Sequence, residues 1–545
     1  MIPRNNFITA ISAVTLIFIF SISCNQNHQT EKKIFHYNES SGIPTLDPAF
    51  SKNHAIMWPV HQLYNTLVEV DTQMNIIPSL AKSWQFSEDK KWIDFQLRQD
   101  VYFHDDIIFK NGKGRKLVAS DIVYSLNRII DKATASPGAW IFNNKLDSIQ
   151  PFIAINDSVF QMRMNAPFVP MLGILSMQYC SIVAKEAVEK YGNEFRSHPV
   201  GTGPFCFVAW EEGQAIILKK NIHYFEKDEK GKSLPYLDGI KISFLESKAT
   251  EFLAFQQNQL DFINDLDASF KDEILTRTGN LKDKWKGKIV LNKHPYLNTE
   301  YLGILVDTNN IQFKNSPLRF NQIRQAINYG IDRKKMMLYL RNSIGTAANS
   351  GFSPLGLPSF DSNSVKGYYY DPAKAKQLIK AAGFDYEHPM SEIKLVTISN
   401  YANLGSYIVN ELKQLGINAS IEVVQKSLLL EQMSKSQVLF FRGSWIADFP
   451  DALNYLSVFY SKNPAPPNYT RYNNLDYDIL FEQSLSENND SLRYLMYKKM
   501  EKMILKDAPI IPLWYDMVLH LHHNNIKGFF PNSINMLELR KLIKE

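Results

Sequence analysis

One short segment contains most of the side chains that could do chemistry. It runs from Arg442 to Asp451, reads Arg-Gly-Ser-Trp-Ile-Ala-Asp-Phe-Pro-Asp, and follows the apolar run 438–441. The Gly-Ser break after a strand-like run predicts a loop, and loops at strand ends often position ligand-binding groups. Within it the Asp448 carboxylate and the Trp445 ring together suit a ligand ammonium, through charge and cation–π attraction. The alternative is structural, because Asp448 or Asp451 could cap the helix expected to follow.

The chain lacks the local signatures of the common enzyme classes. It contains no Gly-x-Ser-x-Gly elbow, no Cys-x-x-Cys or His-Glu-x-x-His motif and no nucleotide-binding glycine pattern. His520 and His522 would share one face of a strand and could hold a metal ion, but no further ligand is apparent near them in the sequence. We therefore expect no metal and no cofactor, and a binding protein rather than an enzyme.

The composition is that of an ordinary globular protein. The 545 residues correspond to roughly three domain-sized units, and 45% of them are hydrophobic and 21% charged. The net charge of +5 is mild and its basic residues are scattered, so we do not expect a nucleic-acid partner. Cys180 and Cys206 could form a disulfide or remain separate thiols.

The N-terminus predicts export and lipid anchoring. Arg4 precedes the apolar segment 7–20, which is too short to span a membrane comfortably. The following Ser-Ile-Ser-Cys resembles a bacterial lipoprotein processing box, in which Cys24 becomes the lipid-modified first residue after removal of residues 1–23. The polar residues 24–33 then predict a flexible tether.

The elements that would position Asp448 alternate between strand and helix patterns. In the first half, the patterns predict a strand at 34–38, helices at 55–67 and 184–191, a strand at 92–103 and a hairpin of strands 205–210 and 215–219. They also predict a helix at 119–130 with Ser120 as its N-cap. The β-α-β order of the second half favours a parallel or mixed sheet covered on both faces. Its predicted strands are 301–306, 393–398, 419–424 and 510–522, and its predicted helices are 317–328, 332–340, 372–382, 407–415 and 494–506.

Several motifs in a fixed order then identify a resemblance. Together they resemble the extracytoplasmic solute-binding proteins of ABC importers, in the family that includes oligopeptide- and dipeptide-binding proteins. Each motif alone is modest, but their collinearity over nearly the whole chain is specific. One departure is Asp106, where the family usually has glycine. The matching segments are Thr45–Pro48, Pro78–Trp84, Phe95–Arg98, Val101–Asp105, Ala119–Ser125, Pro199–Phe205, Arg324–Arg333 and Tyr370–Ala375.

The resemblance implies a two-lobed, hinged α/β protein with the type II periplasmic-binding-protein fold (cluster C-like) and an extra α/β subdomain in the first lobe. Two chain crossings would form the hinge, and a ligand held between the lobes would favour closure, which a permease could recognise. We expect lobe I at 34–77 and 200–295 with the extra subdomain at 78–199, lobe II at 296–513, and a return to lobe I at 514–545.

The resemblance also assigns candidate ligand-binding residues. In peptide-binding members, the aspartate of a Trp-x-x-Asp motif pairs with the ligand's α-ammonium, a role that falls here on Asp448, with Trp445 as a wall and Ala447 and Phe449 as neighbours. An arginine three residues before that tryptophan also occurs in oligopeptide binders. Arg442 has this position, where it could meet a ligand carboxylate or offset Asp448.

The partner of a peptide's C-terminus stays open at this point, with Arg442, lysines of the cleft and His54 as candidates. The resemblance implies a monomeric, non-enzymatic receptor, anchored through Cys24 on the periplasmic side of a bacterial membrane, that delivers di- to oligopeptides to ABC permease subunits. The alternatives are a receptor for another solute, such as an oligosaccharide, an opine-like compound or a metal chelate, and an interaction lipoprotein that has lost transport.

Overall fold

The computed structural model describes residues 32–545. The predicted signal segment 1–23, the predicted lipidation site Cys24 and most of the predicted tether 24–33 therefore lie outside the described residues. Within the part that is described, none of the helices combines the length and the apolar character that crossing a membrane would require.

The first sheet contains the start of the chain and a later hairpin. Its strand order is β1 (Ile34–Asn38), β10 (Gly239–Ser243), β9 (Ala215–Lys220) and β8 (Phe205–Glu211), with β1 parallel to β10 and the other pairs antiparallel. The predicted strand at 34–38 and the predicted hairpin are confirmed. Helix α2 (His54–Leu63) begins after Asn53, whose side chain accepts a hydrogen bond from the Ile56 N–H.

A second, antiparallel sheet lies within the predicted extra subdomain. Its order is β4 (Ala81–Phe86), β5 (Trp92–Leu97), β7 (Val159–Arg163) and β6 (Phe152–Asn156). Helix α3 (Ala119–Ile130) has the predicted bounds, but Ser120 is not its N-cap, because Ala119 is already helical. Instead, the Asp121 carboxylate accepts a hydrogen bond from the Val118 N–H at 3.0 Å.

The third sheet is mixed, as the β-α-β order predicted. Strand β14 is parallel to both β15 and β16, while β11, β17, β12 and β16 pair antiparallel to one another. The strand order is β11 (Phe262–Asn264), β17 (Ile510–His523), β12 (Ile289–Ile304), β16 (Phe440–Ile446), β14 (Ile393–Ile398) and β15 (Ala419–Val424), with β13 (Thr346–Ala347) added to β17.

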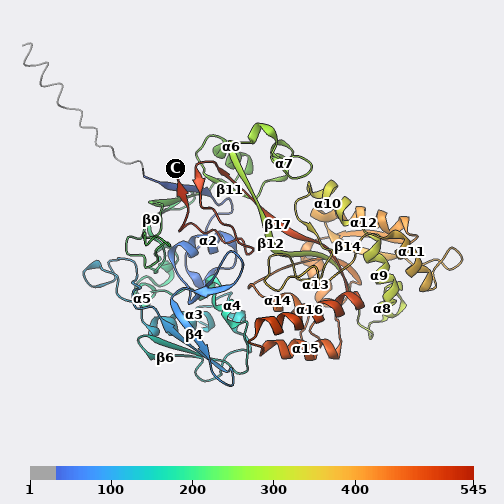
Figure 1. Ribbon diagram of the computed structural model, residues 1–545, viewed down its shortest axis with the longest axis horizontal. Coiled ribbons are helices and arrows are strands. Elements are labelled where there is room, and N and C mark those ends of the chain that lie inside the picture. Colours follow the sequence, from blue (N-terminus) through green and yellow to red (C-terminus); the bar gives the residue numbers. More distant parts are fainter. Residues whose placement is uncertain (1–31) are drawn as a thin grey trace, which may run out of the picture. The chain divides into compact units, whose positions relative to one another are not determined.

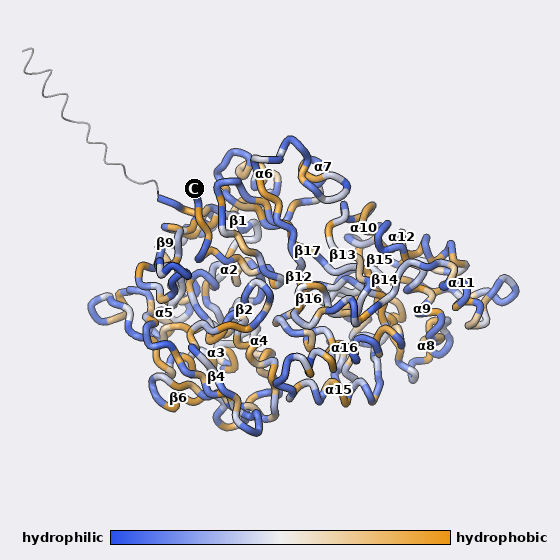
Figure 2. Tube along the Cα trace, in the orientation of Figure 1, coloured by the Kyte–Doolittle hydropathy of each residue, from blue (hydrophilic) through white to orange (hydrophobic). Residues whose placement is uncertain are grey.

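Helices cover both faces of this sheet, and each face has its own apolar core. Leu302 and Ile304 point into one core and Tyr301 into the other, following the alternation of a strand. In Figure 2 many of the peripheral loops are hydrophilic. The helices are α9 (Asn321–Gly330), α10 (Arg333–Arg341), α11 (Pro372–Ala381), α12 (Ala402–Gln414), α13 (Lys426–Ser434), α14 (Leu453–Leu456), α15 (Leu475–Leu485) and α16 (Asp490–Asp507).

Two long paired strands connect the N-terminal and C-terminal parts. β12 and β17 pair from Ile289–His523 to Gly303–Ile510, with a register shift between Pro295 and Thr299, and they lie at the centre of Figure 1. Both predicted lobe boundaries, at 295 and 513, fall inside these strands, which suits a hinge made of two crossings. The remaining short elements are β2 (Val68–Val70), β3 (Ile76–Pro78), α4 (Met171–Leu175), α5 (Lys185–Tyr191), α6 (Lys248–Gln256), α7 (Ala268–Ile274), α8 (Ile311–Asn315), β18 (Ile526–Lys527) and β19 (Ile543–Lys544).

The two cysteines of the described chain are both free thiols. Cys180 is buried and Cys206 is half-buried. Burial raises the pKa of the Cys206 thiol to about 12, so it stays protonated at neutral pH. Of the two alternatives that the sequence left open, the structure has separate thiols.

Candidate functional site

A cavity of about 360 Å³ lies at the end of β16. This volume is in the lower part of the range of roughly 300–1,000 Å³ that small-molecule sites occupy. Segments distant in the sequence contribute to its wall, so only the folded chain assembles it. The lining residues are Ser51–His54, Met57, Trp140, Ser176–Tyr179, Tyr296, Leu297, Ile446–Asp448, Pro450, Ile534 and Met536.

Strand β16 brings Asp448 to the cavity. β16 pairs with β12 up to the pair Asn298–Ile446, and the Ala447 N–H then donates to the Leu297 carbonyl at 2.9 Å. Asp448 is thus the first residue beyond the ladder. The prediction of a loop from Arg442 onward was wrong, because the strand continues through the Gly-Ser pair. Gly443 is required there for packing, since a Cβ atom would lie 2.5 Å from the ring of Tyr301.

The structure separates the two carboxylates of this segment into different roles. Asp451 accepts hydrogen bonds from the Leu453 N–H at 2.8 Å and the Tyr497 hydroxyl at 2.7 Å, and it pairs with Arg493 at 3.4 Å. It therefore has the structural role, holding the turn that leads into α14. Asp448 lines the cavity and has one side-chain contact, from the Asn454 amide at 3.2 Å.

Asp448 is a carboxylate in a partly desolvated position. Its side chain is exposed, but it faces the cavity rather than open solvent. The surrounding protein atoms therefore displace much of the water that would otherwise solvate the carboxylate. This burial raises the pKa of Asp448, and the Asn454 hydrogen bond opposes the rise only in part. Burial, with Asp448 as a second cause, raises the pKa of Tyr179 in the same wall to about 12. Among the described residues, no lysine, arginine or histidine forms an ion pair with Asp448.

Asn454 is the site residue that the sequence did not reveal. Besides its contact to Asp448, it accepts the Trp445 indole N–H through its side-chain oxygen at 2.9 Å and its backbone carbonyl at 3.1 Å. Trp445 itself does not line the cavity and instead packs against the apolar core that contains Tyr301. The available signal was a polar residue inside the otherwise apolar helix Leu453–Leu456, where it is 5% exposed.

Arg442 and Phe449 do not line the cavity. Arg442 forms a buried ion pair with Glu300, and its guanidinium carbon lies 3.5 Å from the centroid of the Tyr401 ring. Its charge is therefore already matched and does not offset Asp448. Phe449 is 7% exposed and packs in the apolar core that contains Phe35 and Ile174, with its ring against Gly173. It anchors the loop that follows the strand.

The C-terminal segment forms the opposite wall, and α2 holds it in place. The Trp58 indole donates to the Asn535 carbonyl at 2.7 Å, and the Gln62 amide donates to the Leu537 carbonyl at 2.7 Å. His54 lines the cavity, with its Nε2 3.0 Å from the Ile534 carbonyl. Burial lowers the pKa of His54, so its ring is neutral at neutral pH.

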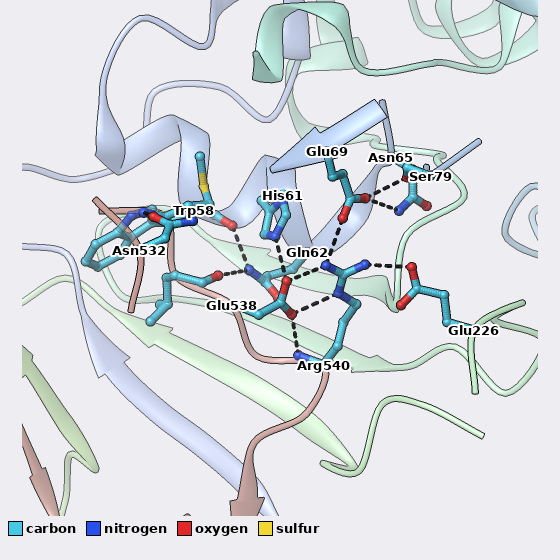
Figure 3. A network of polar contacts seen from close by, with 12 residues as sticks. Trp58, His61, Gln62, Asn65, Glu69, Ser79, Glu226, Asn532, Glu538 and Arg540 are labelled. Atoms are coloured by element: carbon cyan, nitrogen blue, oxygen red, sulfur yellow. Dashed lines mark hydrogen bonds and ion pairs between the residues drawn. The ribbon is translucent and has the colours of Figure 1, made fainter. Parts of the chain in front are cut away.

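A buried charge network supports this segment from behind. Figure 3 shows Arg540 surrounded by the carboxylates of Glu69, Glu226 and Glu538, with His61 beside Glu538. The Arg540 contacts to Glu69 and Glu226 are both 2.8 Å, and His61 Nε2 lies 3.2 Å from Glu538. Burial alone would raise the pKa of Glu538, but Arg540 and His61 hold it well below its ordinary value. The network fixes the C-terminal segment against lobe I.

The two strand histidines considered as metal ligands have other partners. His520 Nε2 lies 3.1 Å from the side-chain oxygen of Asn264 and 2.9 Å from that of Asn535, and His522 Nδ1 lies 2.9 Å from the His523 carbonyl. Across residues 32–545, no group of at least three His, Cys, Asp or Glu side chains is arranged to hold a metal ion.

Comparison with known proteins identifies the family. Residues 75–467 match the family described as "Bacterial extracellular solute-binding proteins, family 5 Middle". The chain is 26% identical to heme-binding protein A of Haemophilus influenzae (86% of this chain, 84% of that protein). It is 25% identical to glutathione-binding protein GsiB of Escherichia coli (90% of each) and 22% identical to dipeptide-binding protein DppE of Bacillus subtilis (93% and 91%).

Solved structures show the same fold. The unliganded open form of the periplasmic murein tripeptide-binding protein MppA has a TM-score of 0.82 at 19% identity, covering 94% of this chain and 98% of that one. The periplasmic binding protein DppA of Helicobacter pylori, in complex with the peptide STSA, has a TM-score of 0.69 at 25% identity, covering 94% and 98%. The chain belongs to family 5 of the bacterial extracellular solute-binding proteins and has their two-lobed type II fold.

Proposed function

We propose that this family 5 solute-binding protein is a receptor for peptides with a free amino terminus, which it binds between its lobes and delivers to the permease of an ABC importer. One observation carries the proposal: the Asp448 carboxylate lines a cavity and pairs with no cation in the described part of the chain. A desolvated, unpaired carboxylate is unfavourable, and a ligand ammonium would remove that penalty.

The surroundings of Asp448 suit an ammonium group attached to an organic body. The Tyr179, Tyr296 and Trp140 rings border the same cavity and offer apolar and cation–π contacts. The cavity volume of about 360 Å³ favours short peptides over long ones. A charge-assisted hydrogen bond of this kind contributes about 1.5–3 kcal/mol.

The hinge supports the transport role. Asp448 follows a strand of lobe II, whereas Ser51–His54 belong to lobe I, so a ligand in the cavity contacts both lobes. Such a ligand favours the closed state, because only that state offers all contacts at once. We propose that a permease recognises this state and that lipid on Cys24 anchors the receptor on the periplasmic side of a bacterial membrane.

Among the relatives, those named for glutathione and dipeptides have ligands with a primary ammonium group, which fits Asp448. Heme is the second candidate, because heme-binding protein A is also a relative. Its anionic propionates would meet the Asp448 carboxylate unfavourably, so we rank it below peptides.

Native mass spectrometry of the purified protein tests the proposal. We expect co-purified masses that correspond to short peptides, and we expect an N-acetylated tripeptide library to displace them far less well than the free library. Hemin is the comparison ligand. If the bound masses are not peptides, or if the acetylated library competes equally, the proposed function is wrong.

A further inference from the structure

We propose that Lys52 of lobe I binds the ligand's carboxylate while Asp448 of lobe II binds its ammonium, so that the site selects short zwitterionic peptides. This inference rests on the proposed function and adds a second anchoring residue and a narrower ligand class. It assigns the partner of the C-terminus, which the sequence left open among Arg442, a lysine and His54.

The charges that line the cavity carry this inference. Five lining residues are ionisable: Lys52, His54, Tyr179, Tyr296 and Asp448. Burial lowers the pKa of His54 and raises those of both tyrosines, so these three are neutral at neutral pH. One positive and one negative side chain remain, which is the complement of a zwitterion.

Lys52 is available for a ligand. It is exposed, and within residues 32–545 its ammonium makes no hydrogen bond and no ion pair. It borders this cavity and also a second one, which Asp47 and Asp131 line. Arg442 and Arg341 already have carboxylate partners, because Arg442 pairs with Glu300 and Arg341 pairs with Asp516 at 2.7 Å. Neither arginine lines the cavity.

The backbone around Lys52 adds further groups that favour an anion. Lys52 immediately precedes Asn53, the N-cap of the ten-residue helix α2, and the N-terminus of a helix attracts negative charge. Ser51 is fully buried and lines the same cavity, and its hydroxyl has no hydrogen-bond partner in the described structure. An unpaired buried hydroxyl is unfavourable, and a carboxylate oxygen would accept its hydrogen bond.

The two charges lie on opposite lobes, and this determines the selectivity. A peptide with both termini free can pair each end and so join lobe I to lobe II. A peptide with one blocked end leaves Lys52 or Asp448 without a partner, which weakens binding and closure together. Extending the peptide beyond the cavity separates its termini and loses one of the two contacts.

The test compares tripeptide libraries with free, C-amidated and N-acetylated ends, using native mass spectrometry of the whole protein. We expect wild type to retain the free-acid library about tenfold better than the amidated one, as for one charge-assisted contact. Lys52→Met should retain the free-acid and amidated libraries equally well, but it should still retain peptides with a free amino terminus better than N-acetylated ones. Lys52→Arg should restore the preference for the free acid, and Lys82→Met, which removes an exposed lysine outside the cavity, should behave as wild type.

The outcomes distinguish this inference from the proposed function. Equal retention of free-acid and amidated libraries by wild type would overturn the role of Lys52 and leave the peptide receptor intact. A preference for the free acid that survives Lys52→Met would also overturn it. Failure of wild type to bind any of the libraries would overturn the proposed function itself.

Discussion

Replacing Asp448 with Asn tests the assignment of the ammonium site directly. The change is isosteric, and the new amide oxygen can still accept the hydrogen bond that the Asn454 amide donates to Asp448 at 3.2 Å. Only the charge is lost. A charge-assisted hydrogen bond is worth about 1.5–3 kcal/mol, so peptide affinity should fall roughly ten- to hundredfold in isothermal titration calorimetry.

The same substitution should not destabilise the ligand-free protein. Burial raises the pKa of Asp448, which means that the charged form is disfavoured in the folded state. Asp448 therefore lowers the free energy of unfolding at neutral pH. This penalty shrinks once the pH falls below the raised pKa and is gone below the ordinary pKa of an unfolded aspartate. We expect Asp448→Asn to leave thermal unfolding unchanged or shifted upward, while it weakens peptide binding.

Peptide affinity should depend on pH for the same reason. Only the ionised carboxylate attracts an ammonium, so wild-type affinity should decline as the pH falls through the raised pKa of Asp448. The affinity of Asp448→Asn should not show this decline. A pH profile shared by both proteins would contradict the assignment.

Asp451→Asn is the matched control, because Asp451 lies three residues further on. Its carboxylate binds the Tyr497 hydroxyl, the Leu453 N–H and Arg493. We expect this variant to lose about 2 kcal/mol or more of unfolding free energy in urea, since it weakens bonds to a buried charge. Its folded form should keep the preference for free over N-acetylated peptides. The assignment fails if Asp448→Asn keeps wild-type affinity, or if Asp451→Asn rather than Asp448→Asn removes that preference.

Other predictions concern the residues that hold the site and the chain. Asn454→Ala removes the contacts to Asp448 and to the indole, so we expect about five- to tenfold weaker peptide binding and altered tryptophan emission; an unchanged Kd would exclude a positioning role. Arg540→Met leaves buried carboxylates without their cation, so unfolding free energy measured in urea should fall by about 3–5 kcal/mol at neutral pH. Because Arg540 holds the pKa of Glu538 below its ordinary 4.5, this contribution is present above that pH and is lost as the pH falls through the folded-state pKa. The difference between the Arg540 variant and wild type should then narrow in acid, and a constant difference would contradict this account. Cys24→Ser should move the protein from the detergent phase to the aqueous phase of a phase-separating detergent, and a wild-type protein already in the aqueous phase would exclude the anchor.

The elements that could be predicted from the sequence are those with strong local signals. The strand at 34–38, the helix at 119–130 and the two strands at 393–398 and 419–424 have the predicted bounds. The start of α11 also follows from local chemistry, because Asp371 caps it and proline occupies its first turn. Each of these signals lies within a few residues of the element that it specifies.

Predictions failed where a distant partner decided the conformation. The strand pattern was expected to end before the Gly-Ser pair, but β16 continues because Gly443 and Ser444 pair with β12. The Tyr301 ring occupies the space that a side chain at position 443 would need. Arg442 was expected to meet a ligand carboxylate or to offset Asp448, whereas in the structure it pairs with Glu300, 142 residues away in sequence. Lys52 and Ser51, which line the same cavity, lie almost 400 residues before Asp448 in the sequence. No sequence pattern near them indicated that they would approach Asp448 in the fold.

The motif from Arg442 to Asp451 locates the candidate site but does not show which of its charged residues are free to bind a ligand. The ion pairs formed on folding make that distinction. In the folded protein Arg442 forms an ion pair with Glu300, and Asp451 forms one with Arg493. Both pairs hold parts of the fold together. Within residues 32–545 no cation pairs with Asp448, although burial disfavours its charge, and this destabilises the folded state unless a cation binds from outside. If Asp448 did nothing except destabilise the folded state, asparagine could replace it without any loss of stability or binding. The proposed ammonium ligand would supply the missing cation and so compensate for this cost.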